Sequence, residues 1–226
     1  MDKVQALAGT AFFAKQRNAL HVVLKDSVCG GCNNGWMSQL EISFINVFRA
    51  QLSRPSQCHL DPLMQERVAT WAVKTALLLM IYTESSGMGP GGYVPKDNLR
   101  WLYENQDPPS LPPGTKVWLG TVANPGNRPV FHQAAALGVE ANGPITAYFS
   151  TFTLGYLIFQ VFGHDIYDSQ NMGALSRDPT IGPPSRLSGR LTEIWPGNGN
   201  KVAWPTAKPL QAAEVPGLHL WPNGTV

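Results

Sequence analysis

Two cysteines separated by two glycines, Cys29 and Cys32, constrain this chain more than any other feature of its sequence. A C-x-x-C spacing lets two thiols face one metal ion, and glycines between them allow the tight turn whose backbone N–H groups stabilise the sulfurs. The chain has three cysteines, so they cannot all pair with one another. The pair therefore predicts zinc binding before it predicts a structural disulfide.

Two other interpretations of this pair stay open. A redox-active dithiol has the same spacing, but it favours the junction of a strand and a helix in a parallel βαβ unit, and the sequence predicts no such unit. Two free, buried thiols are the other interpretation. Zinc is favoured because of the specificity of the motif.

A structural zinc ion takes about four ligands, so Cys29 and Cys32 supply half of a site. His21, Cys58 and His59 are the nearby candidates for the other half. The latter two precede a predicted helix and have no evident spatial relation to the pair. We therefore expect about one zinc ion per chain only if one of these three residues, or a second chain, completes the coordination.

The spacing of apolar residues predicts helices in the first half of the chain. A β-branched run at residues 20–24 leads into the cysteines, and a helix follows over residues 39–49. Asp61 and Pro62 have the residue types of an N-cap and a first helical position, and they open a central core helix that runs to Tyr82. Its expected buried face is Val68, Trp71, Ala72, Thr75, Leu78, Leu79 and Tyr82, and its expected solvent face is Gln65, Glu66, Arg67 and Lys74.

A short helix is expected at residues 96–105, and after it the spacing of apolar residues becomes that of strands. The strands are expected at residues 116–122, 130–139, 145–153, 156–162 and 190–195, before an irregular tail that starts at residue 197. Hairpin order predicts an α+β fold, with the central core helix packed on a mostly antiparallel sheet. The chain then divides into an N-terminal zinc-knuckle and helix segment, residues 1–60, and an α+β domain, residues 61–226.

Charge and hydropathy limit the partners and the cellular location that we expect for the protein. A net charge of +2 is too small to indicate a polyanion partner from the bulk balance, so any nucleic-acid contact must be local, for example at Lys15, Arg17 and Lys25. No run approaches the roughly 20 apolar residues of a membrane span, and the N-terminal residues lack the apolar core of a secretion signal. We expect a cytoplasmic protein with no membrane partner.

The string VCGGCNNGWMSQLE at residues 28–41, with ATWAVKTA at residues 69–76, resembles a bacterial and phage family identified as HNH endonucleases, whose zinc finger is a treble clef. Weaker matches are VWLG at 117–120, TLGYLIFQV at 153–161, and the Trp-Pro pairs at 195–196 and 204–205. The resemblance spans nearly the whole chain. It implies metal-dependent phosphodiester hydrolysis of DNA, with structural zinc and a catalytic Mg²⁺ or Mn²⁺ ion.

The chain departs from this family before Cys29. In the family, the C-x-x-C is normally the second of two, and a Glu-His-Val/Ile-x-Pro-x-Trp-like segment carries the histidine that acts as general base for the attacking water, beside a divalent ion. This sequence has neither. We therefore expect an N-terminally truncated relative that cleaves little or no DNA by itself. The alternative is a non-catalytic zinc-knuckle module that binds nucleic acid or a protein.

Asn33 stands where HNH enzymes often carry the last metal-binding histidine, so the resemblance implies a metal-adjacent amide with a catalytic role. Helix N-capping by Asn33 or Asn34 is the alternative. Trp36 and Met37 are expected to pack in the core rather than under a nucleic-acid strand. His132 and His164 have no cysteine or carboxylate at ligand spacing, so we expect both to be structural.

Overall fold

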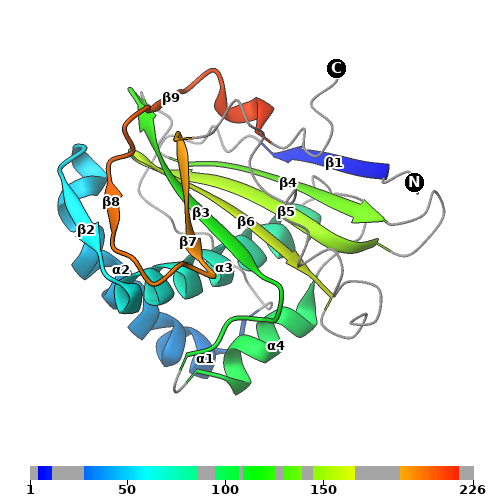
Figure 1. Ribbon diagram of the computed structural model, residues 1–226. Helices are drawn as coiled ribbons and strands as arrows, with labels where there is room; N and C mark the ends of the chain where they lie inside the picture. The colour runs from blue at the N-terminus through cyan, green and yellow to red at the C-terminus, as the bar shows by residue number, and fades with distance from the viewer. Residues whose placement is uncertain are drawn as a thin grey trace.

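The computed structural model describes residues 5–11, 28–85, 95–106, 109–125, 130–138, 145–165 and 189–218. In this part of the chain, helices lie on one side of a large sheet, and the C-terminal segment runs past its other side (Figure 1). The predicted strand at residues 20–24 and the basic residues Lys15, Arg17 and Lys25 lie outside the described residues. None of the described helices is both long and apolar enough to cross a membrane.

The sheet has the strand order β1-β4-β5-β6-β3-β7, and β9 pairs with β3. Every pairing along this order is antiparallel, and only the β3–β9 pair is parallel. The strands are β1 Gln5–Ala11, β3 Lys116–Ala123, β4 Val130–Gly138, β5 Ile145–Leu154, β6 Leu157–His164, β7 Leu191–Trp195 and β9 Leu210–Gln211. The predicted α+β class and its mostly antiparallel sheet are therefore confirmed.

Four helices lie in the described part of the chain: α1 Gly30–Asn34, α2 Trp36–Ser53, α3 Pro62–Ser85 and α4 Lys96–Glu104. The prediction for α3 is confirmed at its start, because the Met64 backbone N–H donates a hydrogen bond of 2.8 Å to Asp61 Oδ1. The helix predicted over residues 39–49 exists, but helical structure begins at Gly30, since the cysteine turn is itself helical.

The solvent face predicted for α3 is partly wrong. Gln65 and Lys74 are both buried, each with 3% of its surface exposed. The Gln65 side-chain amide donates hydrogen bonds to the carbonyls of Leu60 at 2.9 Å and Asn200 at 2.6 Å, so the C-terminal segment crosses the start of α3. Because α3 is surrounded by α2, α4 and the sheet, residues around most of its circumference are buried. The amphipathic period of the helix therefore no longer predicts which residues face solvent.

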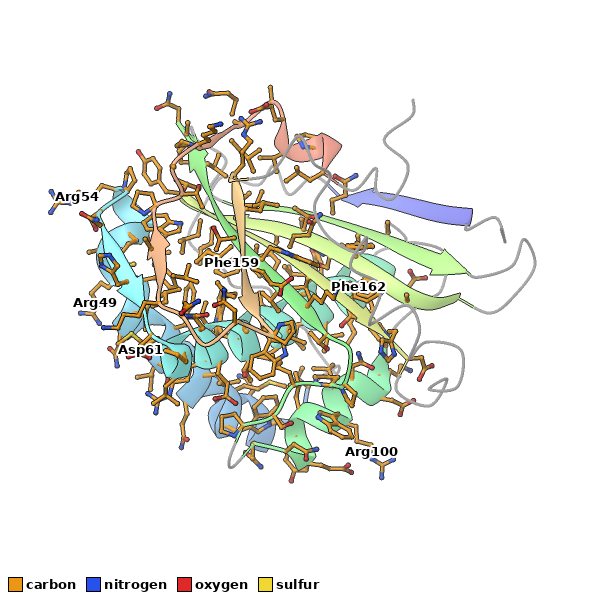
Figure 2. The ribbon with its side chains drawn as sticks, viewed as in Figure 1. Arg49, Arg54, Asp61, Arg100, Phe159 and Phe162 are labelled. Atoms are coloured by element: carbon orange, nitrogen blue, oxygen red, sulfur yellow. The ribbon has the colours of Figure 1, made fainter. Side chains whose placement is uncertain are left out.

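Side chains from both faces of the sheet form two clusters. Phe159 and Phe162, labelled in Figure 2, lie three positions apart on β6 and therefore point to opposite faces. Phe159 packs with Trp71 and Phe44 under the helices, whereas Phe162 packs on the face that the C-terminal segment covers. Residues from both predicted parts of the chain meet in the first cluster, and the boundary at residue 60 stays a prediction.

The C-terminal segment is more ordered than the irregular wrap that its composition predicts. It contains β8 Val202–Trp204, which pairs with β2 Cys58–Leu60, then β9 and the 3-10 helix η2 Val215–Gly217. The buried indole of Trp204 donates a hydrogen bond of 3.0 Å to the Gly120 carbonyl of β3. This segment is therefore part of the fold and not an appendage.

Candidate functional site

The cysteine pair forms a compact turn at the start of α1. Cys29 is the N-cap residue, and its Sγ accepts a hydrogen bond of 3.0 Å from the backbone N–H of Cys32. The two sulfurs lie 2.7 Å apart, within hydrogen-bonding distance of each other. Both cysteines are free; Cys29 is exposed and Cys32 is partly exposed. The predicted convergence of the two thiols is therefore present.

The glycines around the pair have different roles. A Cβ on Gly30 would meet nothing within 4 Å, and one on Gly31 would meet only Cys29 Sγ at 3.9 Å. These two glycines therefore leave the sulfurs uncovered rather than satisfying a strained turn. Gly35 is different, because a Cβ there would lie 2.7 Å from the Gly31 carbonyl oxygen. Only glycine fits this junction between α1 and α2.

Hydrogen bonding makes the two thiols electrostatically unequal. The side-chain contact with Cys32 and the hydrogen bond from the Cys32 backbone N–H hold the pKa of the Cys29 thiol below its usual value. The same contact with Cys29, together with desolvation, raises the pKa of Cys32, and the indole of Trp36 partly opposes this rise. Of the two thiols, Cys29 is therefore the one that loses its proton first as the pH rises.

Asn33 lies directly beside this pair with its side chain exposed. Its backbone N–H donates to the Cys29 carbonyl at 3.0 Å. The capping interpretation is wrong for both asparagines, because Cys29 caps α1 and Gly35, which precedes α2, makes no side-chain capping bond. Asn33 is thus an exposed residue that directly follows Cys32 in the chain.

The other half of a zinc site is not assembled by the described residues. Cys58 and His59 lie in β2, and no three His, Cys, Asp or Glu side chains in the described part of the chain form a metal-binding group. Cys58 is half-buried, and desolvation raises the pKa of its thiol, with a smaller opposing effect from Gln51. His21, the third candidate, lies outside the described residues.

A buried ionic cluster that the sequence analysis missed anchors α2 against α3. Lys74 forms a very short ion pair with Glu41, and the Trp71 indole Nε1–H donates a hydrogen bond of 2.8 Å to the other oxygen of the same carboxylate. The Phe44 ring stacks on Trp71 with the ring centroids 3.5 Å apart. Burial lowers the pKa of Lys74, and Glu41 opposes that shift.

A signal for this cluster exists in the sequence. Glu41 ends the string at 28–41, and Trp71 with Lys74 lies in the string at 69–76, so the two strongest strings of the resemblance meet in space. Trp71 and Lys74 are three positions apart and share one face of α3. The presence of an acidic residue in one string and a lysine in the other could have suggested an ion pair between them.

Trp36 and Met37 agree with their predicted role in packing. Met37 is buried, and the partly buried Trp36 packs against the helix side of the core. His132 is also structural as expected, since its Nε2 lies 3.0 Å from Ser150 Oγ in the sheet. Burial lowers the pKa of His132 to about 3, so this imidazole is neutral at physiological pH.

The basic side chains of α2 lie away from the cysteines. Arg49 and Arg54 project into solvent at the far end of this helix (Figure 2). With 18 residues, α2 is roughly 27 Å long, so these two charges do not adjoin the cysteine pair. A polyanion held by the pair would therefore need other contacts near the start of the helix.

Comparisons with known proteins give little context for this site. An extracellular small neutral protease of Streptomyces sp. (strain C5) is 30% identical over 118 residues, which are 49% of this chain and 49% of that protein. The chain thus spans about half the length of this curated relative. No family model matches the chain. No solved structure matches it either.

Proposed function

We propose that this protein is HNH endonuclease-like and that Cys29 and Cys32 supply two of the four ligands of a structural zinc ion. The observation that carries the proposal is the position of the two thiols, which face each other on one helical turn at the start of α1 and α2. The exposed amide of Asn33 lies beside them. This is half of a treble-clef zinc site, with the candidate catalytic residue next to it.

The pair suits zinc because thiolates are zinc ligands and because the distance between the two sulfurs can change. Two thiolates on one tetrahedral zinc ion lie about 3.8 Å apart, given Zn–S bonds of about 2.3 Å. The sulfurs are 2.7 Å apart and must separate slightly, which side-chain rotation allows because neither is fully buried. Of the two further ligands, His21 would supply one, or a second chain would supply both.

The cluster of Glu41, Trp71 and Lys74 supports this role mechanically. It attaches α2 to the core helix four positions after Met37, so the cysteine turn extends from an anchored helix. Zinc would tie a further segment to this turn, and a separate Mg²⁺ or Mn²⁺ ion would stabilise charge on a DNA phosphate. Asn33 would orient a ligand or water at that ion. A reducing, cytoplasmic setting, in which the thiols stay free, suits the proposal.

A general base is the part of the nuclease mechanism for which we propose no residue. Loss of such a base typically lowers the rate by roughly 10²–10⁴-fold. We therefore expect little or no cleavage of DNA by this chain alone. The alternative function, a non-catalytic zinc knuckle that binds nucleic acid or a protein, needs the same zinc ligands but neither Asn33 nor a base.

The protease name of the similar protein does not lead to a competing proposal. The likeness covers half of each chain, and the sequence contains no H-E-x-x-H pair of zinc-binding histidines. No Ser-His-Asp arrangement stands out in it either. No described side chains therefore favour peptide hydrolysis.

Zinc stoichiometry tests the proposed site. The reduced protein is loaded with zinc, dialysed, and measured by elemental analysis and by native mass. One zinc ion per chain indicates completion by His21, and one per two chains in a dimer indicates a shared four-cysteine site. Cys32→Ser should abolish uptake, whereas Cys58→Ser should leave it unchanged. A wild-type protein that retains no zinc and keeps all three thiols reactive contradicts the proposal.

A plasmid-nicking assay with Mg²⁺ or Mn²⁺ separates the nuclease from the interaction module. We expect at most weak nicking, reduced further by Asn33→Ala and by Cys32→Ser. Strong nicking that both variants lose would show that another residue supplies the base. Nicking that neither variant changes would come from a contaminant and would favour the interaction module.

A further inference from the structure

The two thiols of the knuckle are arranged for a second kind of chemistry. Residues three apart on a helical turn are neighbours on one face, so rotation about their Cα–Cβ bonds can bring their sulfurs together. Here the rotation has already occurred, because the sulfurs lie 2.7 Å apart and nothing else stands between them. A bond between them shortens the distance between the sulfurs from 2.7 Å to about 2.05 Å.

We propose that Cys29 and Cys32 are a redox-active dithiol, which exchanges with small-molecule disulfides and closes reversibly to an intramolecular disulfide. This inference does not depend on zinc binding, since it needs only the two sulfurs and a disulfide of the glutathione type. It does assign a regulation to the proposed site, because an oxidised pair has no thiolate left to bind zinc.

The reaction proceeds in two balanced exchanges. Cys29 loses its proton to water, and its sulfur attacks the disulfide R–S–S–R, which forms a mixed disulfide and releases one RS⁻ that takes up a proton. Cys32 then loses its proton and attacks the Cys29 sulfur, which releases the second RS⁻. Two protein thiols are oxidised, one disulfide is reduced to two thiols, and no proton or electron is left over.

Access decides which sulfur reacts first. Cys29 is exposed, and because a Cβ on Gly31 would lie 3.9 Å from its sulfur, the absence of a side chain at Gly31 leaves this sulfur more open. Cys32 is less exposed, with Trp36 beside it on the following turn. Cys29 is therefore the attacking sulfur, and Cys32 resolves the mixed disulfide. Cys58 is half-buried in β2 and has no second thiol near it among the described residues, so it serves as an internal control.

The first experiment equilibrates the full chain with glutathione and oxidised glutathione in the presence of a chelator, then traps the remaining thiols with an alkylating agent. Mass spectrometry should show two thiols lost together with no added glutathione, while Cys58 stays alkylated. Loss of one thiol at a time, with glutathione attached, would overturn the proposal. The chelator keeps this result separate from zinc binding, which is measured as metal uptake.

Single-serine variants test the order of attack. Cys32→Ser should retain one glutathione on Cys29, at least roughly tenfold more than the wild type, because the intramolecular resolving thiol is gone. Cys29→Ser should retain less on Cys32. Equal retention in the wild type and in Cys32→Ser would show that Cys32 does not resolve the mixed disulfide and would reject the dithiol. Circular dichroism of each variant confirms that it is folded.

Discussion

The cysteine pair and the cluster of Glu41, Trp71 and Lys74 belong to the same layer of helices, yet opposite kinds of contact hold them. The cysteines contact each other across three positions of one turn, on an open surface. The cluster joins residues 30 and 33 positions apart, and its lysine is buried. A site built from local contacts can therefore change its chemistry with little effect on the fold, whereas the cluster cannot.

The two regions also place their charge differently. Cys29, whose thiol has the lower pKa of the two, is exposed, so water solvates its charged form. The ammonium of Lys74 is removed from water, and its one carboxylate partner, Glu41, is 44% exposed at the side chain. A buried charge without its partner is costly, whereas a half-exposed charge is not. The following substitutions test this contrast.

The largest effect is expected at Trp71. Trp71→Ala removes a ring with 2% of its surface exposed, together with its stacking on Phe44 and its hydrogen bond to Glu41. We expect the free energy of unfolding to fall by about 3–5 kcal/mol, measured by urea denaturation. Tyr103→Ala, at an aromatic residue that is 51% exposed, is the control and should cost less than about 1 kcal/mol. Similar losses in both variants would mean that α3 is not the centre of the core.

Removal of the Glu41 charge should have the next largest effect. Glu41→Gln keeps the shape of the side chain but leaves the buried Lys74 ammonium without a counter-charge. We expect a loss of about 2 kcal/mol near neutral pH, less than for a fully buried pair because Glu41 is partly exposed. Lys74→Met is the matched comparison and should change stability by less than about 1 kcal/mol, because the remaining carboxylate stays hydrated.

The cost of Glu41→Gln should depend on pH. Burial lowers the pKa of Lys74, so between that pKa and its ordinary value near 10.5 the unfolded chain binds more protons and stability rises with pH. Glu41 raises this pKa, so in Glu41→Gln the pH range over which stability rises with pH begins at a lower pH. The loss of stability caused by Glu41→Gln should therefore shrink as the pH rises. The double variant with Lys74→Met should lose this dependence. A loss that does not change with pH anywhere below the ordinary lysine pKa of 10.5 would argue against a buried charge.

A third effect concerns His132 in the sheet. Its pKa is lowered to about 3 by burial, so the unfolded chain binds a proton between about pH 6.5 and about pH 3 and the folded chain does not. Stability should fall as the pH drops through this window, by about 2 kcal/mol at about pH 5 from this residue alone. His132→Gln should flatten the acid limb of the stability curve, whereas the exposed His59→Gln should leave it unchanged.

The smallest effect is expected at Cys29. Cys29→Ser keeps an oxygen that can accept the Cys32 backbone N–H, so the urea midpoint should stay within error. Cys29→Ala removes the cap and should cost less than about a quarter of the Trp71→Ala loss, because α1 is short and exposed. A large loss in either variant would mean that the pair holds the fold together and would remove the contrast between the two regions.

The elements that local rules govern were predictable. The Asp61 cap and the five later strands follow from residue type and period alone, since each depends on neighbours within a few positions. The same holds for the facing thiols of Cys29 and Cys32. The strands β8 and β9 were missed, because each is at most three residues long and exists only through its partner strand.

By itself, the sequence determined the α+β class, the long helix that begins at Pro62 and the pairing of two thiols on one turn, because short-range geometry decides all three. Only the tertiary structure decided that Lys74 lies inside the protein and pairs with Glu41. A lysine on an amphipathic helix reads as a solvent-facing residue until a second helix covers it. The packing of one helix on another brings together residues that are far apart in the chain, so the periodicity of a single segment cannot predict it.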